Sequence, residues 1–357
     1  MSIPVLHYCT GRTATTQHRT DGHPRPAQQT NRHNERDHHT TMETFTVNIL
    51  GCGSAKPTPR HMPTSQIVDF RSKYFMIDCG EGTQVQMQRM GLSMARVGHI
   101  FISHNHGDHV FGLPGLISTM ALLGRTATLY VHGPAEVEQF LQCILDTYCE
   151  GINFEVKFCP VDPTQYQLIH DERALSVWSL PLKHRIPCCG YLFREKPSLP
   201  HIRREMIDAF DIPVSQINNI KAGASWTLPD GTVIPHEQLT TPTPPPRSYA
   251  YCSDTCYLPQ LADLVRGVDL LYHEATYPDE FELRATQTCH STARQAGRLA
   301  REAEVHQLVI GHFSARILNE KALLREAKQE FPETDLAREG MIVDVRRKDF
   351  VIQGNRG

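Results

Sequence analysis

Short apolar stretches that end at polar turns recur along most of the chain. Residues 45–51 alternate between apolar and polar as a strand does, and they end in a glycine. Residues 97–103, 175–182 and 306–311 are further apolar runs, each followed by a polar residue that ends the run. Runs of this length and composition fit strands that are at least half buried.

Two other stretches show the helical period instead. Residues 135–145 place apolar side chains at helical spacing, and residues 292–303 do the same after Ser291, the expected N-cap. Strands and helices therefore alternate in two successive halves of the chain. This pattern predicts an α/β protein.

Residues 193–248 interrupt the pattern. Nine prolines fall here, and Asp230-Gly231 is typical of a hairpin turn. Six Lys/Arg are balanced by six Asp/Glu, so the segment is not a strong basic patch. We interpret it as an arm inserted into the main domain.

The first 41 residues differ in composition from the rest. They are rich in Thr, Gln, Asn, Arg and His, carry few apolar residues and show no periodicity. Such a segment buries too little apolar surface to fold, which predicts a disordered N-terminal extension. Residues 42–357 are then expected to form one domain.

Composition sets broad limits on this 357-residue chain. A hydrophobic content of 40% is ample for a sizeable core, and no run approaches the length of a membrane span. The eleven cysteines are scattered and odd in number, which favours a reducing cytoplasm. A net charge of −3 does not indicate a nucleic-acid binder, but a local basic groove would suffice for one.

The segment 104–109 reads HNHGDH and holds four metal-type ligands in six positions. His104 and His106 lie two apart, so they point the same way off an extended chain, while Asp108 and His109 face a second point where the chain turns. One histidine in such a turn would be an ordinary surface residue. Four ligands together favour two adjacent divalent cations, with zinc preferred by imidazole and carboxylate.

A site for two cations needs further ligands from other parts of the chain. His184, Asp254 and His312 each follow a predicted strand, where a turn brings a side chain to the rim of a sheet. Asp254 is the natural bridging ligand because a carboxylate has two oxygens to share. Each of these residues alone would be unremarkable, but together with the hexapeptide they predict a dinuclear site.

Several motifs together resemble one family. They are the hexapeptide with the following FGLPGL (111–116), DCGEGTQ (78–84), HEAT (273–276), HST (290–292) and HFSAR (312–316). From about residue 45 to 351 the chain resembles ribonuclease Z, the tRNA 3′-processing branch of the metallo-β-lactamase superfamily. The resemblance implies an αββα sandwich with a projecting tRNA-gripping arm at the position of residues 193–248.

The resemblance also implies a ligand set and two zinc ions per subunit, for which manganese or iron are possible substitutes. The first zinc is expected to be held by His104, His106 and His184, the second by Asp108, His109 and His312, and both by Asp254. Two cations about 3.5–4 Å apart activate water and neutralise both oxygens of a phosphodiester displacement. Asp108 is therefore expected to be catalytic as well as a ligand.

Other roles are carried over from the same motifs. His290 is the expected proton donor to the leaving oxygen, and Glu274 is expected to orient it; a bond from Glu274 to a backbone amide is the plainer alternative. Asp78 is expected to orient a ligating histidine. Arg316 is expected to hold a substrate phosphate, with a surface salt bridge as the alternative.

The function implied is an endoribonuclease that removes the 3′ trailer from tRNA precursors, leaving a tRNA 3′-hydroxyl and a 5′-phosphate on the trailer. A homodimer in the cytoplasm is expected. One alternative is a phosphodiesterase of the same superfamily acting on other nucleotides or small diesters. Another is a non-catalytic RNA-binding protein, against which Asp108 argues because a structural zinc needs no open position.

One loop departs from the family pattern. Residues 57–62 read PTPRHM, where the family commonly has Pro-x-Lys-x-Arg-Asn. That loop is linked to the rejection of tRNAs that already carry their CCA end. The resemblance therefore does not predict this discrimination here.

Overall fold

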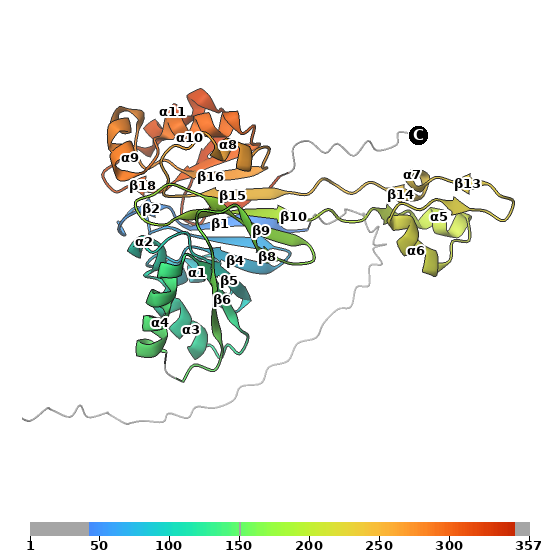
Figure 1. Ribbon diagram of the computed structural model, residues 1–357, viewed down its shortest axis with the longest axis horizontal. Coiled ribbons are helices and arrows are strands. Elements are labelled where there is room, and N and C mark those ends of the chain that lie inside the picture. The colour runs from blue at the N-terminus through green and yellow to red at the C-terminus, as the bar shows by residue number, and fades with distance from the viewer. Residues whose placement is uncertain (1–42, 150, 347–357) are drawn as a thin grey trace, which may run out of the picture. The chain divides into compact units, whose positions relative to one another are not determined.

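Two seven-stranded sheets form the body of the protein in a computed structural model that describes residues 43–149 and 151–346 (Figure 1). The extension predicted for residues 1–41 lies outside these residues. The first sheet has the order β20 (Ile342–Asp344), β1 (Phe45–Gly51), β3 (Ser65–Phe70), β4 (Lys73–Ile77), β5 (Val97–Phe101), β6 (Leu129–Gly133) and β7 (Val156–Pro160). The second has the order β19 (Thr334–Leu336), β17 (Gln307–Gly311), β16 (Leu270–Glu274), β15 (Ser248–Cys252), β10 (Cys189–Glu195), β9 (Leu175–Pro181) and β8 (Gln167–Asp171).

The strand directions place several loops at the same edge. In the first sheet β4, β5, β6 and β7 run parallel, and in the second β15, β16, β17 and β19 do the same. The remaining pairs are antiparallel. Because parallel strands end at a common edge, residues that directly follow them are brought together.

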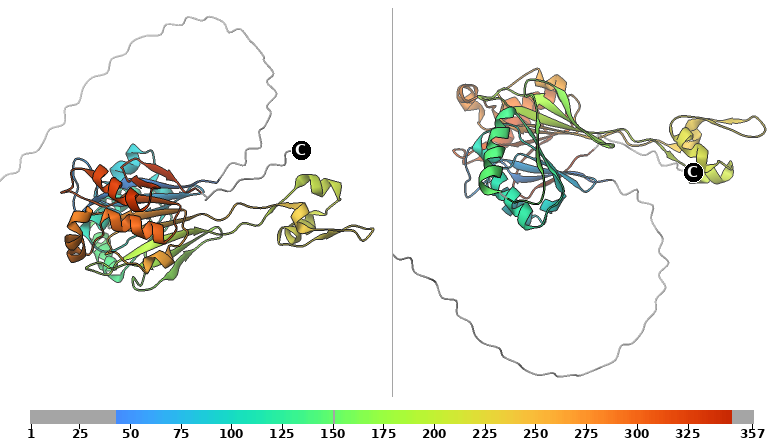
Figure 2. Two further views of the ribbon diagram at one scale, coloured as in Figure 1. Left: turned by 90° about the horizontal axis from the view of Figure 1, so that it is seen from above. Right: turned by 60° about the horizontal axis from the view of Figure 1, so that its bottom comes forward.

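Helices cover the outer face of each sheet. On the first sheet α1 (Thr83–Arg89), α3 (Leu113–Leu122) and α4 (Ala135–Tyr148) bury apolar side chains in one cluster with β3 to β6. On the second, α10 (Ala293–Glu302) packs on β16 and β17, and α8 (Leu261–Leu264) and α11 (Glu320–Glu330) pack against α10 and contact β9 and β19 respectively. Figures 1 and 2 show the two helical layers on opposite sides of the paired sheets. The predicted αββα sandwich is confirmed.

Shorter elements complete the body, and they belong to the loops. They are β2 (Gly53–Ser54), η1 (Met94–Arg96), α2 (Gly107–Val110), η2 (Asp279–Phe281), α9 (Glu282–Thr288) and β18 (Phe313–Ser314). Within the ranges that the structure describes, no helix is both long and apolar enough to span a bilayer.

The core between the sheets joins residues far apart in the sequence. Phe75 and Phe101 of the first sheet contact Phe193 of the second, with ring centroids 6.1 and 5.5 Å apart. Tyr249 stacks on Phe193 from the neighbouring strand. All four rings are at most 1% exposed, so they close the sandwich with large apolar surfaces.

One predicted helix cap is wrong by a residue. The cap of α10 is Thr292, whose side chain accepts the amide of Gln295 while the Gln295 side chain accepts the amide of Thr292. This reciprocal pair satisfies two helix amides that have no intrahelical partner. The hydroxyl of Ser291 instead donates to the carbonyl of Thr255, 2.7 Å away.

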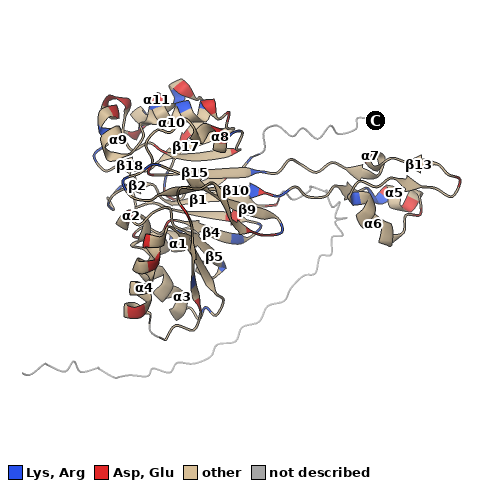
Figure 3. Ribbon diagram, viewed as in Figure 1, with Lys and Arg blue, Asp and Glu red and all other residues tan. Residues whose placement is uncertain are grey.

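The inserted arm carries its own small core, and two extended segments join it to β10 and β15 (Figure 1). It contains β11 (His201–Ile202), α5 (Arg204–Ala209), α6 (Val214–Lys221), β12 (Trp226–Thr227), β13 (Val233–Ile234), α7 (His236–Leu239) and β14 (Thr240–Thr241). Ile212, Ile220 and Leu239 are buried together there. Figure 3 shows acidic and basic residues interleaved on α5, in line with the balanced charge.

The predicted limits of the arm, residues 193–248, reach into the body. Phe193 is fully buried in β10 and pairs with Tyr249, and Arg194 pairs with Ser248. The arm therefore comprises the residues between these strands, 196–247. The sequence pattern misplaced the limits because Phe193 and Arg194 form the end of a strand that continues directly into the extended connection.

Candidate active site

The candidate ligands follow the ends of strands and meet at one edge of the sandwich. The segment that begins at His104 follows β5, His184 follows β9, Asp254 follows β15 and His312 follows β17. The predicted metal ligands fall into two groups whose ligand atoms lie within 4.8 Å of one another: His104, His106, His184 and Asp254 in one, and Asp108, His109 and His312 in the other. The structure thus brings the residues of each predicted set close together, and Asp254, His290 and His312 form a further group within the same distance.

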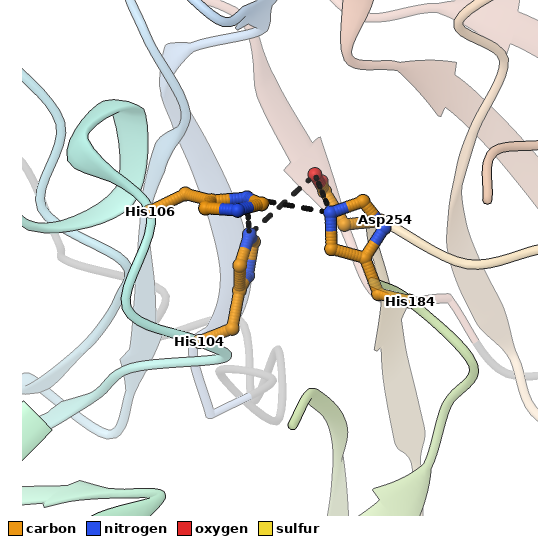
Figure 4. Close-up of side chains that lie close together, drawn as sticks. All are labelled: His104, His106, His184 and Asp254. Atoms are coloured by element: carbon orange, nitrogen blue, oxygen red, sulfur yellow. Dashed lines mark hydrogen bonds and ion pairs between the residues drawn. The ribbon is translucent and has the colours of Figure 1, made fainter. Parts of the chain in front are cut away.

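Three imidazoles and a carboxylate converge in the first group (Figure 4). His106 Nδ1 lies 2.9 Å from His104 Nε2 and 3.3 Å from His184 Nε2. Burial holds the pKa of His104 well below its usual range, so the ring is neutral and has a lone pair to offer at pH 7. Three neutral imidazoles facing one point are a donor set that suits zinc.

The second group contains two buried imidazole nitrogens that face carboxylate oxygens but form no regular hydrogen bond with them. His109 Nε2 and His312 Nε2 are buried and have no hydrogen-bond partner within the described ranges. Both lie 3.6 Å from Asp108 Oδ2. A cation between these nitrogens and the carboxylate oxygens would give all of them a partner. These residues therefore fit a metal ion.

Asp254 lies between the two groups. Its Oδ2 is 3.6 Å from His104 Nε2 and 3.7 Å from His184 Nε2. Its Oδ1 is 3.0 Å from His312 Nε2 and 3.4 Å from His109 Nε2. Although burial opposes ionisation, the surrounding imidazoles hold the pKa of Asp254 well below its usual range. One oxygen of an ionised carboxylate thus faces each group.

In most of these imidazoles, Nδ1 contacts a polar atom of a neighbouring residue. Asp78 Oδ2 lies 2.8 Å from His109 Nδ1, and Asp78 also accepts the amide of Ser103 and the hydroxyl of Tyr251. The predicted placement of Asp78 behind a histidine agrees with this contact. His184 Nδ1 lies 3.0 Å from the carbonyl of Cys289. Such contacts fix which nitrogen keeps its lone pair for a metal.

His290 and Glu274 form a pair beside this site. His290 Nδ1 lies 2.9 Å from Glu274 Oε1. Although burial lowers it, the neighbouring Glu274 carboxylate raises the pKa of His290 to about 9, so the ring is protonated at neutral pH. Glu274 also accepts the amides of Thr255 and Ser291, so the plainer backbone-binding role occurs together with the expected one.

A cleft of about 480 Å³ opens over the candidate ligands. His106, Asp108, His184, Asp254 and His290 line it, together with Lys56, Arg185 and seven other residues. The sequence analysis did not identify Lys56 or Arg185, although Arg185 directly follows the candidate ligand His184. Arg316, the predicted phosphate ligand, is exposed and is not part of the lining.

Comparisons with known proteins agree with this geometry. A family model described as Anti-Pycsar protein Apyc1 matches residues 45–158, about a third of the chain, including the HNHGDH segment. Proteins named Ribonuclease Z from Parabacteroides distasonis and Porphyromonas gingivalis are 55% and 48% identical over 304 residues, which is 85% of this chain and 100% of each relative.

Solved structures show the same fold. The crystal structure of the human tRNase Z short form aligns with a TM-score of 0.60 at 24% identity, over 85% of this chain and 100% of that one. A metallo-β-lactamase-fold protein from Bacillus subtilis aligns with a TM-score of 0.61 at 19% identity, over 85% and 99%. With a metallo-β-lactamase fold and relatives this similar over their whole length, the chain belongs to the ribonuclease Z family.

Proposed function

We propose that this protein is the endoribonuclease that removes 3′ trailers from tRNA precursors, leaving a 3′-hydroxyl on the tRNA and a 5′-phosphate on the trailer. Its relatives bear the name Ribonuclease Z. The observation that carries the proposal is the position of Asp254, with one carboxylate oxygen toward each group of imidazoles. That arrangement suits a pair of cations, which phosphodiester cleavage commonly uses.

The proposed cofactor is two zinc ions per chain, with manganese or iron as possible substitutes. Asp254 would contact both ions. His104, His106 and His184 would hold the first ion, and Asp108, His109 and His312 the second. When bound, such a pair supplies activated water and neutralises the charge that develops on the phosphodiester.

His290 is the proposed general acid. Its Nδ1 is engaged by Glu274, so Nε2 is the nitrogen left to deliver a proton to the leaving ribose 3′-oxygen. Glu274 stabilises the protonated ring and keeps its orientation, and two backbone amides hold Glu274 itself in place. Acting through His290, Glu274 is a positioning residue.

Lys56 and Arg185 are the proposed contacts for substrate phosphates. Both are exposed at the cleft, where a cation can reach phosphate oxygens that flank the scissile bond. The arm is proposed to grip the tRNA at a distance from the site, and a homodimer would allow one subunit's arm to serve the other. We place the activity in the cytoplasm.

Incubation of the purified protein with a 3′-extended tRNA precursor tests the proposal, with the cut mapped at both new ends. We expect cleavage at the 3′ side of the tRNA, and we expect Asp254→Ala to abolish it while lowering the zinc content. Asp263→Ala, which removes an exposed carboxylate outside the cleft, is the matched control and should be unaffected. A protein that turns over small diesters but leaves the precursor intact would instead support the alternative phosphodiesterase.

A further inference from the structure

A second cluster of histidines lies outside the cleft lining, and the chemistry proposed above does not use it. His99 comes from β5, His132 from β6 and His170 from β8. Since β5 and β6 belong to the first sheet and β8 is the edge strand of the second, the cluster connects the two sheets. None of these residues lines the cleft.

The three rings converge closely. His99 Nδ1 lies 3.0 Å from His132 Nε2, and the ring centroids of His99 and His170 are 4.1 Å apart. One nitrogen of each ring falls within 4.8 Å of the others. Phe101 stacks on His132 with a centroid distance of 4.5 Å, so the cluster is packed against the aromatic core.

His99 and His132 are in the protonation state that a metal requires. Burial, followed by the nearby imidazoles, lowers the pKa of His99 to about 4 and that of His132 to about 3. Both rings are therefore neutral at pH 7 and keep a lone pair. His170 Nε2 lies 3.3 Å from Glu172 Oε1, and a proton donated there leaves Nδ1 with its lone pair. Metal-binding histidines commonly donate their other nitrogen to a carboxylate in this way.

His132 has few polar partners other than the histidines of the cluster. Its ring belongs to a residue that is only 3% exposed, and Nδ1 has no hydrogen-bond partner within the ranges that the structure describes. Its Nε2 contacts only the imidazole of His99 among those atoms, so Nε2 is the nitrogen that faces the other rings of the cluster. Two imidazole nitrogens 3.0 Å apart either share one proton in a hydrogen bond or, when both rings keep their lone pairs, can bind the same cation.

We propose that His99, His132 and His170 bind one Zn²⁺ ion, which links β5 and β6 of the first sheet to β8 of the second. Three imidazoles form a nitrogen-only set, which favours a borderline cation such as zinc over Mg²⁺ or Ca²⁺, which prefer oxygen. A fourth position can be filled by water. The site is structural, because it holds two sheets together and does not face the cleft.

Zinc content measured on the full-length protein tests the proposal. The protein is stripped with EDTA, reloaded with Zn²⁺, freed of excess metal and analysed for zinc per chain. We expect His132→Phe, which keeps an aromatic ring in the stack, to bind one zinc fewer than the wild type. His170→Gln, at a side chain that is 15% exposed, should lose the same single ion with less disturbance of the core. His201→Gln, at an exposed histidine of the arm, is the control and should lose none.

A second comparison separates this site from the cleft. In an Asp254→Ala background, one zinc should remain, and adding His132→Phe should remove it. Cleavage of a tRNA precursor by His170→Gln should persist, since the cleft is untouched. If His132→Phe and His170→Gln both retain the zinc content of the wild type, the proposal is overturned, whatever the cleft itself binds.

Discussion

At the scale of single residues, three polar residues of the candidate site have a strained backbone conformation. Asp78, Asp254 and His312 have φ values of 54°, 60° and 59°, a left-handed conformation that costs a non-glycine residue about 1–2 kcal/mol. All three lie in loops directly after strands, and all three point a polar group into or behind the candidate metal centre. Six other non-glycine residues among those the structure describes also have positive φ, but at these three the conformation sets the direction of a side chain of the candidate site.

His290→Ala should discriminate between substrates by their leaving groups. The ribose 3′-oxygen leaves poorly without a proton, so the loss on a tRNA precursor should be roughly 10²–10⁴-fold. A nitrophenolate leaves readily, so the same variant should lose much less on a nitrophenyl phosphodiester. Steady-state rates on both substrates measure the difference.

Two further comparisons test whether His290 acts as the general acid or as a metal ligand. Glu274→Gln should show the same selectivity at smaller amplitude, because it acts only through the imidazole. Zinc content should be unchanged in His290→Ala, which matters because His290 also lies close to Asp254 and His312. An equal loss on both substrates, or a loss of zinc, would assign His290 a ligand role instead.

Arg185 and Arg316 allow the same substitution to be compared at two arginines, one in the cleft and one outside it. Arg185 lines the cleft, whereas Arg316 is exposed outside it. A charge-assisted bond to phosphate contributes about 1.5–3 kcal/mol, so Arg185→Ala should lower kcat/KM on a tRNA precursor about tenfold or more. Arg316→Ala should change it little. The reverse order of effects would restore the role that the sequence first assigned to Arg316.

The sequence points to candidate ligands more readily than to the side chains and carbonyls that contact them. Residues such as His184 and Asp254 are recognisable because each is a metal-type ligand directly after an apolar run. Their partners are not, since the carbonyl that holds His184 belongs to Cys289, 105 positions away. The cluster around His132 is equally hidden, because its members sit inside strands where a histidine gives no separate signal.

At the scale of elements, strands with one clear pattern were predictable and strand ends were not. The prediction of residues 45–51 matches β1 from end to end, and α4 extends the helix predicted from residue 135. β10 is different, because it is buried on both faces and lacks alternation until the chain leaves the sheet. Its pairing with β15 across the arm is a long-range contact that local pattern cannot supply.

The arm should be separable from the chemistry. Because its buried residues form a cluster apart from the two larger ones, replacing 197–246 with a short Gly/Ser linker should leave the sandwich folded. Binding of a tRNA precursor should weaken, while hydrolysis of a small phosphodiester should persist, since remote contacts contribute binding energy and not bond cleavage. Affinity by filter binding and small-diester turnover measure the two effects.

The outcome for the small substrate decides the interpretation. Equal loss of small-diester turnover and tRNA binding would show that the arm supports the cleft itself. A milder variant, Leu239→Ala, opens the core of the arm without removing the connections and should weaken tRNA binding in the same direction.

At the scale of the whole molecule, the two sheets share one large core, and the histidine cluster lies between β5 and β6 of the first sheet and the edge strand β8 of the second. Burying neutral imidazoles there ties the stability of the sandwich to pH. His132 is faced by His99 and His170, and the wider surroundings include Glu172 and Lys73. No carboxylate or hydroxyl contacts His132 directly within the described ranges, so nothing there compensates its protonation.

Metal-free protein should therefore lose stability in mild acid through His132. The pKa of His132 is about 3 in the folded state and 6.5 ordinarily. Between pH 6.5 and pH 3, the residue is therefore mostly protonated in the unfolded chain and neutral in the folded chain. The free energy of unfolding falls as the pH drops from 6.5 toward 3, and at pH 5 the loss from this residue is about 2 kcal/mol. Urea unfolding of EDTA-treated protein at pH 7 and pH 5 measures it. His132→Phe should reduce the difference between the two pH values by that amount, while His201→Phe should leave it unchanged; an identical pH dependence in the wild type and His132→Phe would show that the imidazole is not a buried neutral group.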